Sequence, residues 1–284
     1  MGVCKGLVKP NEPRAKKRFG QHFLRDTGVV ECIVRWIQPS PDDLFLDIGA
    51  GDGALSSRLA PGVSRLLAIE IDADCIPHLE GVLASFESAT VVEGDILQLN
   101  LTDLISPHLQ PGRKLRIAGN LPYNIATAII EKLLHAGLPI ADMCFMVQLE
   151  VAQRITAAPG TRQYGFFSVD CQHHSDVRFG FKVSPACFVP RPQVCSATVS
   201  FRPKPSPLSA DLEPDFEAIC KAAFSHRRKT LENSLSIHPV FGKTSRLLLA
   251  RAGINGSRRA EQLSVQEYER LAQTYNELRI TNYQ

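Results

Sequence analysis

The feature that most constrains the fold of this 284-residue chain is a short apolar run that ends in a glycine-rich turn. The run is Leu44-Phe45-Leu46-Asp47-Ile48, and the turn is Gly49-Ala50-Gly51-Asp52-Gly53. An apolar run of this length predicts a buried strand. Glycines let the chain turn tightly and let a ligand approach the backbone. The same turn could also serve only to connect a strand to a helix.

Strand and helix patterns alternate along the first half of the chain. The predicted strands are 44–48, 66–70, a short one at 91–92, 115–118 and 143–148. The predicted helices are 26–38, one that carries Ala54, Leu55 and Leu59, 73–83 and 125–135. Near-continuous apolar strands that alternate with helices indicate a parallel sheet covered by helices on both faces.

Three of the predicted strands end in a polar residue: Glu70, Asp95 and Asn120. Ligands of such sheets bind at the carboxyl ends of the strands. Each carboxylate could alone be a solvated strand end. Together with the glycine turn, however, these residues predict one crevice into which Gly-rich backbone, two carboxylates and an amide project.

The two carboxylates favour a nucleoside ligand. Glu70 lies 19 residues after Gly51, where an acidic side chain can accept hydrogen bonds from both ribose hydroxyls. Asp95 can accept from an adenine amino group. The third glycine comes one position early for a dinucleotide fingerprint, and no G-K-[ST] sequence follows to bind phosphates. A ribose site without a pyrophosphate site points to S-adenosylmethionine.

The fourth strand end, Asn120-Leu121-Pro122-Tyr123, predicts a site for a planar amine. The Asn120 side-chain oxygen and the Leu121 carbonyl can accept two hydrogen bonds from an exocyclic amine. Tyr123 offers a face on which a base can stack. The alternative is an ordinary turn, since Asn and Pro favour turns.

These motifs, in this order, resemble the KsgA-type small-subunit ribosomal RNA adenine dimethyltransferases. The resemblance runs from Lys17 to about Leu235. The matching stretches are Arg18-Phe19-Gly20-Gln21-His22-Phe23-Leu24, Asp47-Ile48-Gly49-Ala50-Gly51, Glu70, Gly94-Asp95, Asn120-Leu121-Pro122-Tyr123-Asn124, Tyr164-Gly165 and Phe188-Val189-Pro190-Arg191-Pro192-x-Val194. The resemblance implies dimethylation at N6 of two adjacent adenosines near the 3′ end of small-subunit (16S) rRNA, during subunit biogenesis.

The resemblance also implies roles for individual residues. The expected S-adenosylmethionine site consists of Gln21, His22, Leu24, Gly49, Gly51, Glu70, Asp95, Ile96 and Asn120. The expected catalytic group is Asn120, Leu121, Pro122, Tyr123 and Phe188, with Phe188 packed on the target base opposite Tyr123. The chain has Val194-Cys195-Ser196 where relatives usually have Val-Asp-Ser, and Gln193 where Lys is common.

The rest of the chain predicts a second, smaller domain. Strands are expected at 177–183 and 197–201, followed by a proline-rich linker, 202–207. Helices are expected at 215–225, 231–236, 245–252 and 264–278. The predicted architecture is α/β: a basic arm at 1–25, a Rossmann-like methyltransferase domain at 26–205 and a helical rRNA-contacting domain at 206–284.

The charge distribution favours a polyanionic partner. Residues 1–25 hold seven basic side chains and only Glu12 as an acidic one. A basic arm of this kind fits contact with nucleic acid, although a solvated tail has the same composition. We assign rRNA phosphate contacts to Lys16, Lys17, Arg18, Arg227, Arg228 and Lys229. The alternative for the second cluster is a solvated helix face.

Composition narrows the setting of the protein. No window approaches the roughly 20 apolar residues of a membrane span, and the basic N-terminus lacks the apolar core of a signal peptide. The eight scattered cysteines contain no C-x-x-C pair, so we expect reduced thiols, a cytoplasmic location and no metal. Cys171-Gln172-His173-His174 lacks a second ligand pair at zinc spacing and is interpreted as packing. We expect a monomer.

Three competing functions remain to be distinguished. A large-subunit rRNA adenine methyltransferase of the antibiotic-resistance type would share the cofactor site, but the 188–194 loop and Asn124 favour the small-subunit enzyme. A ribosome-assembly factor on the same fold would not need Glu70, Asp95, Asn120 and Tyr123 intact. An NAD-dependent oxidoreductase is disfavoured by the glycine spacing.

Overall fold

The computed structural model describes residues 13–110, 113 and 115–281, apart from the side chains of Lys17 and Thr281. The chain divides into two compact units. The first is the chain up to Ala152 together with Arg178–Arg202, and the second is Gln153–Val177 together with the chain from Pro203 onwards. The predicted domain boundary between residues 205 and 206 lies close to the observed boundary between 202 and 203. Residues 153–177 belong to the second unit, although the sequence analysis assigned them to the first domain.

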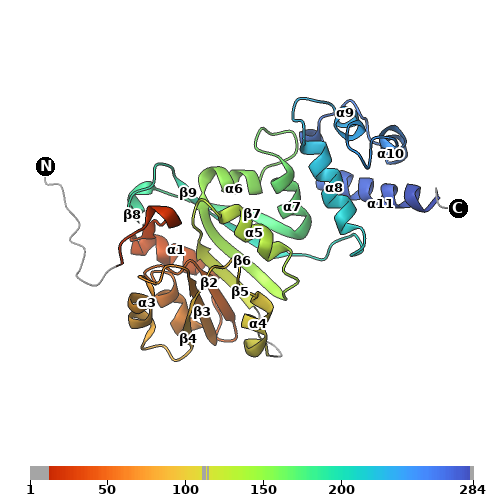
Figure 1. Cartoon of the computed structure of the whole chain (residues 1–284). Coiled ribbons are helices and arrows are strands. Elements are labelled where there is room, and N and C mark those ends of the chain that lie inside the picture. The colour runs from red at the N-terminus through yellow and green to blue at the C-terminus, as the bar shows by residue number, and fades with distance from the viewer. Residues whose placement is uncertain (1–12, 111–112, 114, 282–284) are drawn as a thin grey trace. The chain divides into compact units, whose positions relative to one another are not determined.

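The first unit is built on a mixed sheet (Figure 1). Its strands are β2 Leu44–Ile48, β3 Arg65–Glu70, β4 Ala89–Glu93, β5 Leu115–Asn120, β6 Ile140–Gln148, β7 Ser175–Val183 and β9 Ser196–Pro203, in the order β4-β3-β2-β5-β6-β9-β7. Strands β2 to β6 pair in parallel, as predicted. Strand β9, which the sequence analysis did not assign to this sheet, pairs antiparallel to β6 and makes the sheet mixed. An apolar run such as 197–201 does not reveal the direction of its neighbour.

Helices pack on both faces of this sheet. Helices α1 Thr27–Ile37, α2 Ser56–Leu59 and α3 Ile76–Leu83 share one apolar cluster with the sheet residues Phe45, Leu66, Ala68 and Ala118. Helices α4 Leu101–Ile105 and α5 Ala126–Leu134 lie on the other face (Figure 1). The predicted helices start up to three residues too early, and α4 was not predicted.

Helix α1 illustrates how local sequence sets an element's ends. The Asp26 side chain accepts a hydrogen bond from Val29 N at 3.1 Å, which caps the first turn. Gln38 ends the helix in the left-handed region, with φ of 52°, directly before Pro39. Val30, Ile33 and Ile37 form the buried stripe that the periodicity predicted.

Two short strands join segments that are far apart in the sequence. Strand β1 Phe23–Leu24 pairs antiparallel with β8 Phe188–Val189, so the 18–24 motif and the 188–194 loop meet in space. Short 3-10 helices lie at η1 Lys17–Phe19, η2 Ala60–Gly62, η3 Ser106–His108, η4 Pro185–Cys187 and η5 Ala260–Gln262.

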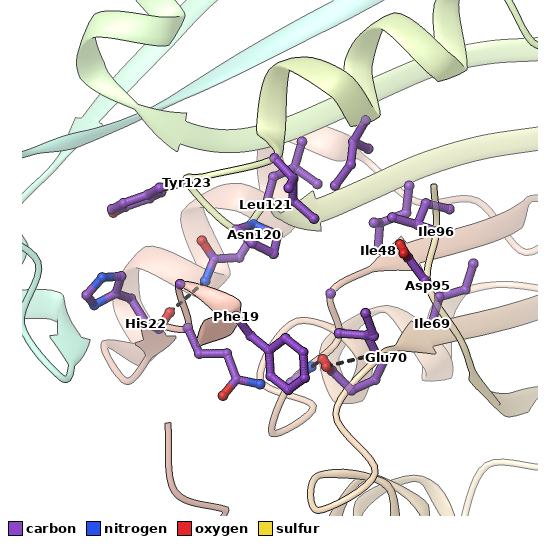
Figure 2. A pocket seen from close by; sticks show the side chains of 18 of the residues that line it. Phe19, His22, Ile48, Ile69, Glu70, Asp95, Ile96, Asn120, Leu121 and Tyr123 are labelled. Carbon is purple, nitrogen blue, oxygen red and sulfur yellow. Dashed lines mark hydrogen bonds between the residues drawn. The ribbon is translucent and has the colours of Figure 1, made fainter. Parts of the chain in front are cut away.

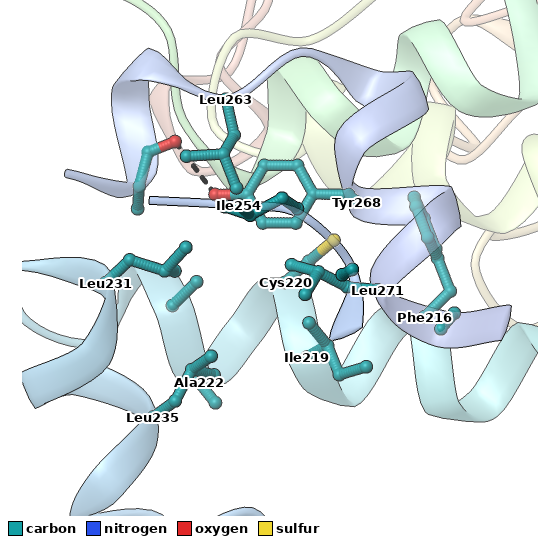
Figure 3. Close-up of a cluster of buried hydrophobic side chains, with 14 of the residues drawn as sticks. Phe216, Ile219, Cys220, Ala222, Leu231, Leu235, Ile254, Leu263, Tyr268 and Leu271 are labelled. Carbon is teal, nitrogen blue, oxygen red and sulfur yellow. Dashed lines mark hydrogen bonds between the residues drawn. The ribbon is translucent and has the colours of Figure 1, made fainter. Parts of the chain in front are cut away.

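The second unit is helical. It contains α7 Phe166–His174, α8 Glu213–Phe224, α9 Leu231–Ser236, α10 Ser245–Arg251 and α11 Val265–Thr281, and α6 Leu149–Ile155 spans the first division of the chain. The sequence predicted the last four helices of this unit but missed α6 and α7. Tyr164 and Val169 lie in the same apolar core as α8 and α11, which explains why 153–177 joins this unit. Figure 3 shows that core around Phe216, Cys220 and Tyr268.

The Cys171-Gln172-His173-His174 stretch contributes to this core. The imidazole of His173 is fully buried, stacks on Phe216 with ring centroids 4.0 Å apart, and bonds through Nδ1 to Glu269 at 2.8 Å. Its Nε2 lies 3.1 Å from Glu213, a potential ligand that α8 supplies and that the sequence interpretation did not foresee. Both ring nitrogens therefore face carboxylates, which satisfies a buried polar group.

Two general expectations can be compared with the fold. The seven cysteines among the described residues are all free thiols, as expected. Among the same residues, no helix is long and apolar enough to cross a bilayer.

Candidate active site

The carboxyl ends of β2, β3, β4 and β5 open into one cavity, the place where parallel sheets of this kind bind ligands. Figure 2 shows His22, Asn120 and Tyr123 at one end of this cavity and Glu70, Asp95 and Ile96 at the other. Its lining is Phe19, Gly20, Gln21, His22, Phe23, Ile48, Gly49, Gly51, Ile69, Glu70, Ile71, Gly94, Asp95, Ile96, Asn120, Leu121, Pro122, Tyr123, Ile125 and Ile129. The crevice that the sequence predicted is therefore present.

The glycine-rich turn brings backbone amides to the cavity. Gly49 and Gly51 have φ of 70° and 57°, a backbone region that residues other than glycine rarely adopt. The N–H of Gly51 donates to Glu70 Oε2 at 2.8 Å, so the end of β3 holds the turn that follows β2. The turn thus has a structural partner as well as a ligand-facing surface.

Glu70 is more heavily engaged than the sequence indicated. Besides Gly51 N at Oε2, its Oε1 accepts from Ile71 N and Asp72 N, both at 2.9 Å. The side chain is only 4% exposed, and burial raises the pKa of its carboxyl while the three backbone N–H groups act in the opposite direction. Because two of its acceptor sites at Oε1 are used, Oε2 is the oxygen best placed to accept from a ligand hydroxyl.

Asp95 lies at the next strand end and is half-buried. Its Oδ1 accepts from Leu97 N at 2.9 Å, and its Oδ2 accepts from the Gln98 side chain at 3.1 Å. These local bonds fix the carboxylate beside Ile96, which is 5% exposed and forms an apolar part of the cavity wall. A carboxylate next to an apolar wall suits an adenine ring that carries an amino group.

The amide of Asn120 has a defined orientation. Its Nδ2 donates to the backbone carbonyl of His22 at 2.9 Å (Figure 2). Because the amide is planar, this bond turns Oδ1 to the opposite side as an acceptor. Leu121 N donates to Met146 O at 3.0 Å, which holds the peptide that follows Asn120 against β6.

Tyr123 is held beside His22. Their ring centroids lie 5.2 Å apart, and His22 Nδ1 donates to Pro190 O at 2.7 Å. The Tyr123 hydroxyl shares a hydrogen bond of 2.5 Å with Oγ of Ser196, a fully buried residue at the start of β9. Burial raises the pKa of the Tyr123 phenol, which therefore stays protonated. The resulting aromatic platform is fixed from two sides.

This geometry agrees with comparison to known proteins. A family model described as "Ribosomal RNA adenine dimethylase" matches residues 12–277. The chain belongs to this family. Among curated proteins, it is 42% identical over 265 residues to the "Ribosomal RNA small subunit methyltransferase A" of Chromohalobacter salexigens, covering 93% of this chain and 92% of the other. It is 41% identical to the protein of that name from Pseudomonas syringae pv. syringae, covering 97% and 100%.

Solved structures support the fold of this dimethylase family. A dimethyladenosine transferase from Plasmodium falciparum superimposes with a TM-score of 0.78 at 22% identity, covering 90% of this chain and 98% of the other. The 23S rRNA methyltransferase ErmE gives 0.68 at 24% identity, covering 89% and 99%. The predicted Rossmann-like methyltransferase fold is confirmed, and the NAD-dependent alternative is not supported.

Two residues assigned from the family resemblance do not reach the cavity. Phe188 is 2% exposed, and Leu24 is 5% exposed; they pair across β1 and β8 and lie in the apolar cluster beneath α1. Neither lines the main cavity, although Leu24 borders a smaller adjoining pocket. In this structure Phe188 is a core residue, whereas the rings of Tyr123 and His22 line the cavity side by side.

Lys16, one of the residues predicted to contact phosphate, forms ion pairs within the protein. Its ammonium contacts Asp72 Oδ1 at 2.6 Å and Asp74 Oδ2 at 2.5 Å, and the hydrogen bond that it donates to Asp72 is the main reason that its pKa is raised. Lys16 is thus engaged by two carboxylates of its own chain, and its contact with RNA phosphate stays a prediction. The side chain of Lys17, and Lys5 and Lys9 of the basic arm, lie outside the described residues.

The remaining basic residues stay at the surface. Arg18 is exposed with its guanidinium 4.6 Å from the Phe19 ring centre. Arg228 and Lys229 are exposed in the turn between α8 and α9, not on a helix face. Arg227, in the same turn, donates to Arg162 O at 2.8 Å.

Sequence reasoning missed several functional neighbours. The apolar wall of the cavity comes from Phe19, Ile48, Ile69, Ile71, Ile125 and Ile129. Phe19 lies within the 18–24 motif, and Ile48 and Ile69 lie at the ends of predicted strands, so position alone could have suggested them. Nothing local indicated Ser196 as the partner of Tyr123 or Asp72 as the partner of Lys16, because both contacts join distant segments.

Proposed function

We propose that this chain transfers methyl groups from S-adenosylmethionine to N6 of two adjacent adenosines near the 3′ end of small-subunit rRNA, dimethylating each. Membership of the adenine dimethylase family supports the reaction, and relatives of about 40% identity that are named for the small subunit support the substrate. The observation that carries the proposal is the orientation of the Asn120 amide beside Tyr123, at the end of the cavity opposite Glu70 and Asp95.

The cavity fits S-adenosylmethionine by the chemistry of its lining. Glu70 and Asp95 place two carboxylates at consecutive strand ends, suited to ribose hydroxyls and an adenine amine. Ile96 and Ile69 provide apolar surface for the ring. Residues Gly49, Gly51, Gln21 and His22 complete the wall. When bound, this donor supplies an electrophilic methyl group on a sulfonium sulfur.

The residues at the other end orient the acceptor amine. An adenine N6 lone pair is delocalised into the ring and is a poor nucleophile. Asn120 Oδ1 and the Leu121 carbonyl accept the two N6 hydrogens, which favours a pyramidal nitrogen whose lone pair faces the methyl group. Holding reactants in this alignment lowers a barrier by several kcal/mol.

This scheme needs no general base before methyl transfer. The attacking amine is neutral, and its proton becomes acidic only after transfer. His22 therefore serves binding: its Nδ1–H donates to Pro190 O, and its ring stands beside Tyr123, on which the target base stacks. Cys195 is exposed and has no chemical step assigned to it, so Cys195→Ser should remain active.

The RNA contacts that we propose use the exposed arginines and lysine rather than Lys16. Arg18 lies next to Phe19 at the cavity, where it can meet the phosphates that flank the target base. In the second unit, Arg228 and Lys229 can meet phosphates elsewhere on the rRNA. The target adenosines must be unstacked to enter the cavity.

The deciding experiment is methylation of unmodified small and large ribosomal particles with labelled donor, followed by mapping of the label. Label at two adjacent adenosines of the small subunit is expected. Label on large-subunit rRNA would establish the alternative specificity, and no label on either would favour a non-catalytic assembly factor.

The variant that tests the acceptor end of the cavity is Asn120→Ala. It should slow single-turnover methylation by at least about tenfold, or on the order of 1.4 kcal/mol of barrier, while RNA binding is retained. An unchanged rate would contradict the role of the Asn120 amide.

A further inference from the structure

Asp72 joins the N-terminal segment to the end of β3. Its carboxylate accepts from Lys16 Nζ at 2.6 Å, from Gln21 Nε2 at 3.1 Å and from Asp74 N at 3.2 Å. The Gln21 side chain closes the arrangement, because its Oε1 accepts from Lys16 N at 2.8 Å. Asp72 is 1% exposed, so its charge has been removed from water and depends on these partners.

The residues fastened in this way border the donor end of the cavity. Phe19, Gly20, Gln21 and His22 line one wall, and they lie in the segment that Lys16 begins. On the opposite side, Asp72 N donates to Glu70 Oε1 at 2.9 Å. One buried aspartate therefore fixes both the N-terminal wall of the cavity and the carboxylate expected to hold the ribose.

We propose that Lys16 and Asp72 are positioning residues of the S-adenosylmethionine site, whose ion pair fastens residues 16–22 across the cavity and slows donor release. The inference rests on the proposed function, but neither residue touches the donor. The pair acts on the affinity for the donor and not on the methyl-transfer step. Since Lys16 is 27% exposed in its side chain, dissolved salt weakens the pair, and donor affinity should fall as ionic strength rises.

The pairing also separates this role from a phosphate contact. A Lys16 ammonium that moved to an RNA phosphate would leave the buried Asp72 carboxylate uncompensated, which is costly. Each phosphate contact contributes about one unit to the slope of log affinity against log salt. Lys16→Met should therefore leave the salt dependence of RNA binding unchanged if the ion pair is its function.

The test compares Lys16→Met with Lys16→Arg and with Arg14→Met. Arg14 is exposed and lies two residues away, so its substitution matches the charge change. For Lys16→Met we expect the KM for the donor and the donor dissociation rate in stopped flow to rise about three- to fivefold, as for loss of a partly exposed pair. The kcat at saturating donor should be unchanged. Lys16→Arg should restore both values, and Arg14→Met should not alter them.

Hydrogen exchange gives a readout that does not need the donor. Backbone amides of residues 16–22 should exchange faster in Lys16→Met than in wild type or Arg14→Met. Unchanged exchange and unchanged donor dissociation would overturn the proposal, as would a salt slope for RNA binding that falls by about one with donor release unaffected. If wild type itself bound no S-adenosylmethionine, the proposed function would fail, and hydrogen exchange alone would decide whether the pair fastens the segment.

Discussion

Replacing Glu70 by Gln removes one charge and almost no volume, yet the structure predicts a substantial effect. Gln can still accept from Ile71 N and Asp72 N through its one oxygen. Its amino group must then face Gly51 N, where the two heavy atoms in wild type are 2.8 Å apart. Two donors cannot bond, so the Gly51 N–H loses its acceptor, at a cost of about 1–3 kcal/mol for a buried group.

One effect offsets part of this cost. Burial raises the pKa of the Glu70 carboxyl, which means that the protein already disfavours its charge. A neutral Gln avoids that penalty, so we expect a net loss of about 1–2 kcal/mol in the free energy of unfolding. Affinity for S-adenosylmethionine should fall at least about tenfold, because the turn at Gly51 and the ribose acceptor are both disturbed. In Glu70→Ala, the affinity for S-adenosylmethionine should fall roughly 10- to 150-fold.

The assay pairs calorimetric unfolding with calorimetric titration of the donor. Asp95→Asn is the matched control, since Asn keeps an oxygen for Leu97 N. That variant should lose donor affinity with a change in unfolding free energy within about 0.5 kcal/mol. If Glu70→Gln unfolded and bound donor like wild type, the bond from Gly51 would not support the turn and the reasoning would be refuted.

Three other groups can be perturbed: the buried Asp47, the bonded pair Tyr123 and Ser196, and the basic turn at Arg228 and Lys229. Burial raises the pKa of Asp47 to about 7, well above an unfolded value near 3.9. Folding therefore favours the protonated form, so the free energy of unfolding should fall as pH rises from about 4 to 7. In urea unfolding, Asp47→Asn should flatten this pH dependence, and an unaltered dependence would count against the prediction. Ser196→Ala and Tyr123→Phe should each keep most single-turnover activity. In a double-mutant cycle of unfolding free energies, the two substitutions should show a coupling of about 0.5–1.5 kcal/mol. If Tyr123→Phe were as inactive as Tyr123→Ala, the hydroxyl would have a chemical role. Arg228→Ala and Lys229→Ala should each lower the salt slope of RNA binding by about one, and wild-type slopes would show that this turn does not contact phosphate.

The sequence by itself determined the strand ends and the residues that they carry. Short apolar runs followed by glycine or by a polar residue are local patterns, and a parallel α/β sheet brings such ends to one edge. Gly49, Glu70, Asp95 and Asn120 could therefore be assigned to one crevice before any contact was known, and the cavity confirms that they meet. Helix α1 was equally predictable, because its cap and its apolar stripe are local.

Tertiary structure alone decided what each of those residues touches. Charge marks Lys16 as a cation but does not reveal that a buried Asp72, 56 residues later, is its partner. An aromatic motif residue such as Phe188 can face a ligand or the core, and its pairing with Leu24 places it in the core. Partners distant in sequence also decide the direction of β9. They decide as well that residues 153–177 belong to the helical unit. Local patterns fix which surface a segment buries, whereas long-range packing and charge pairing select the surface it is buried against.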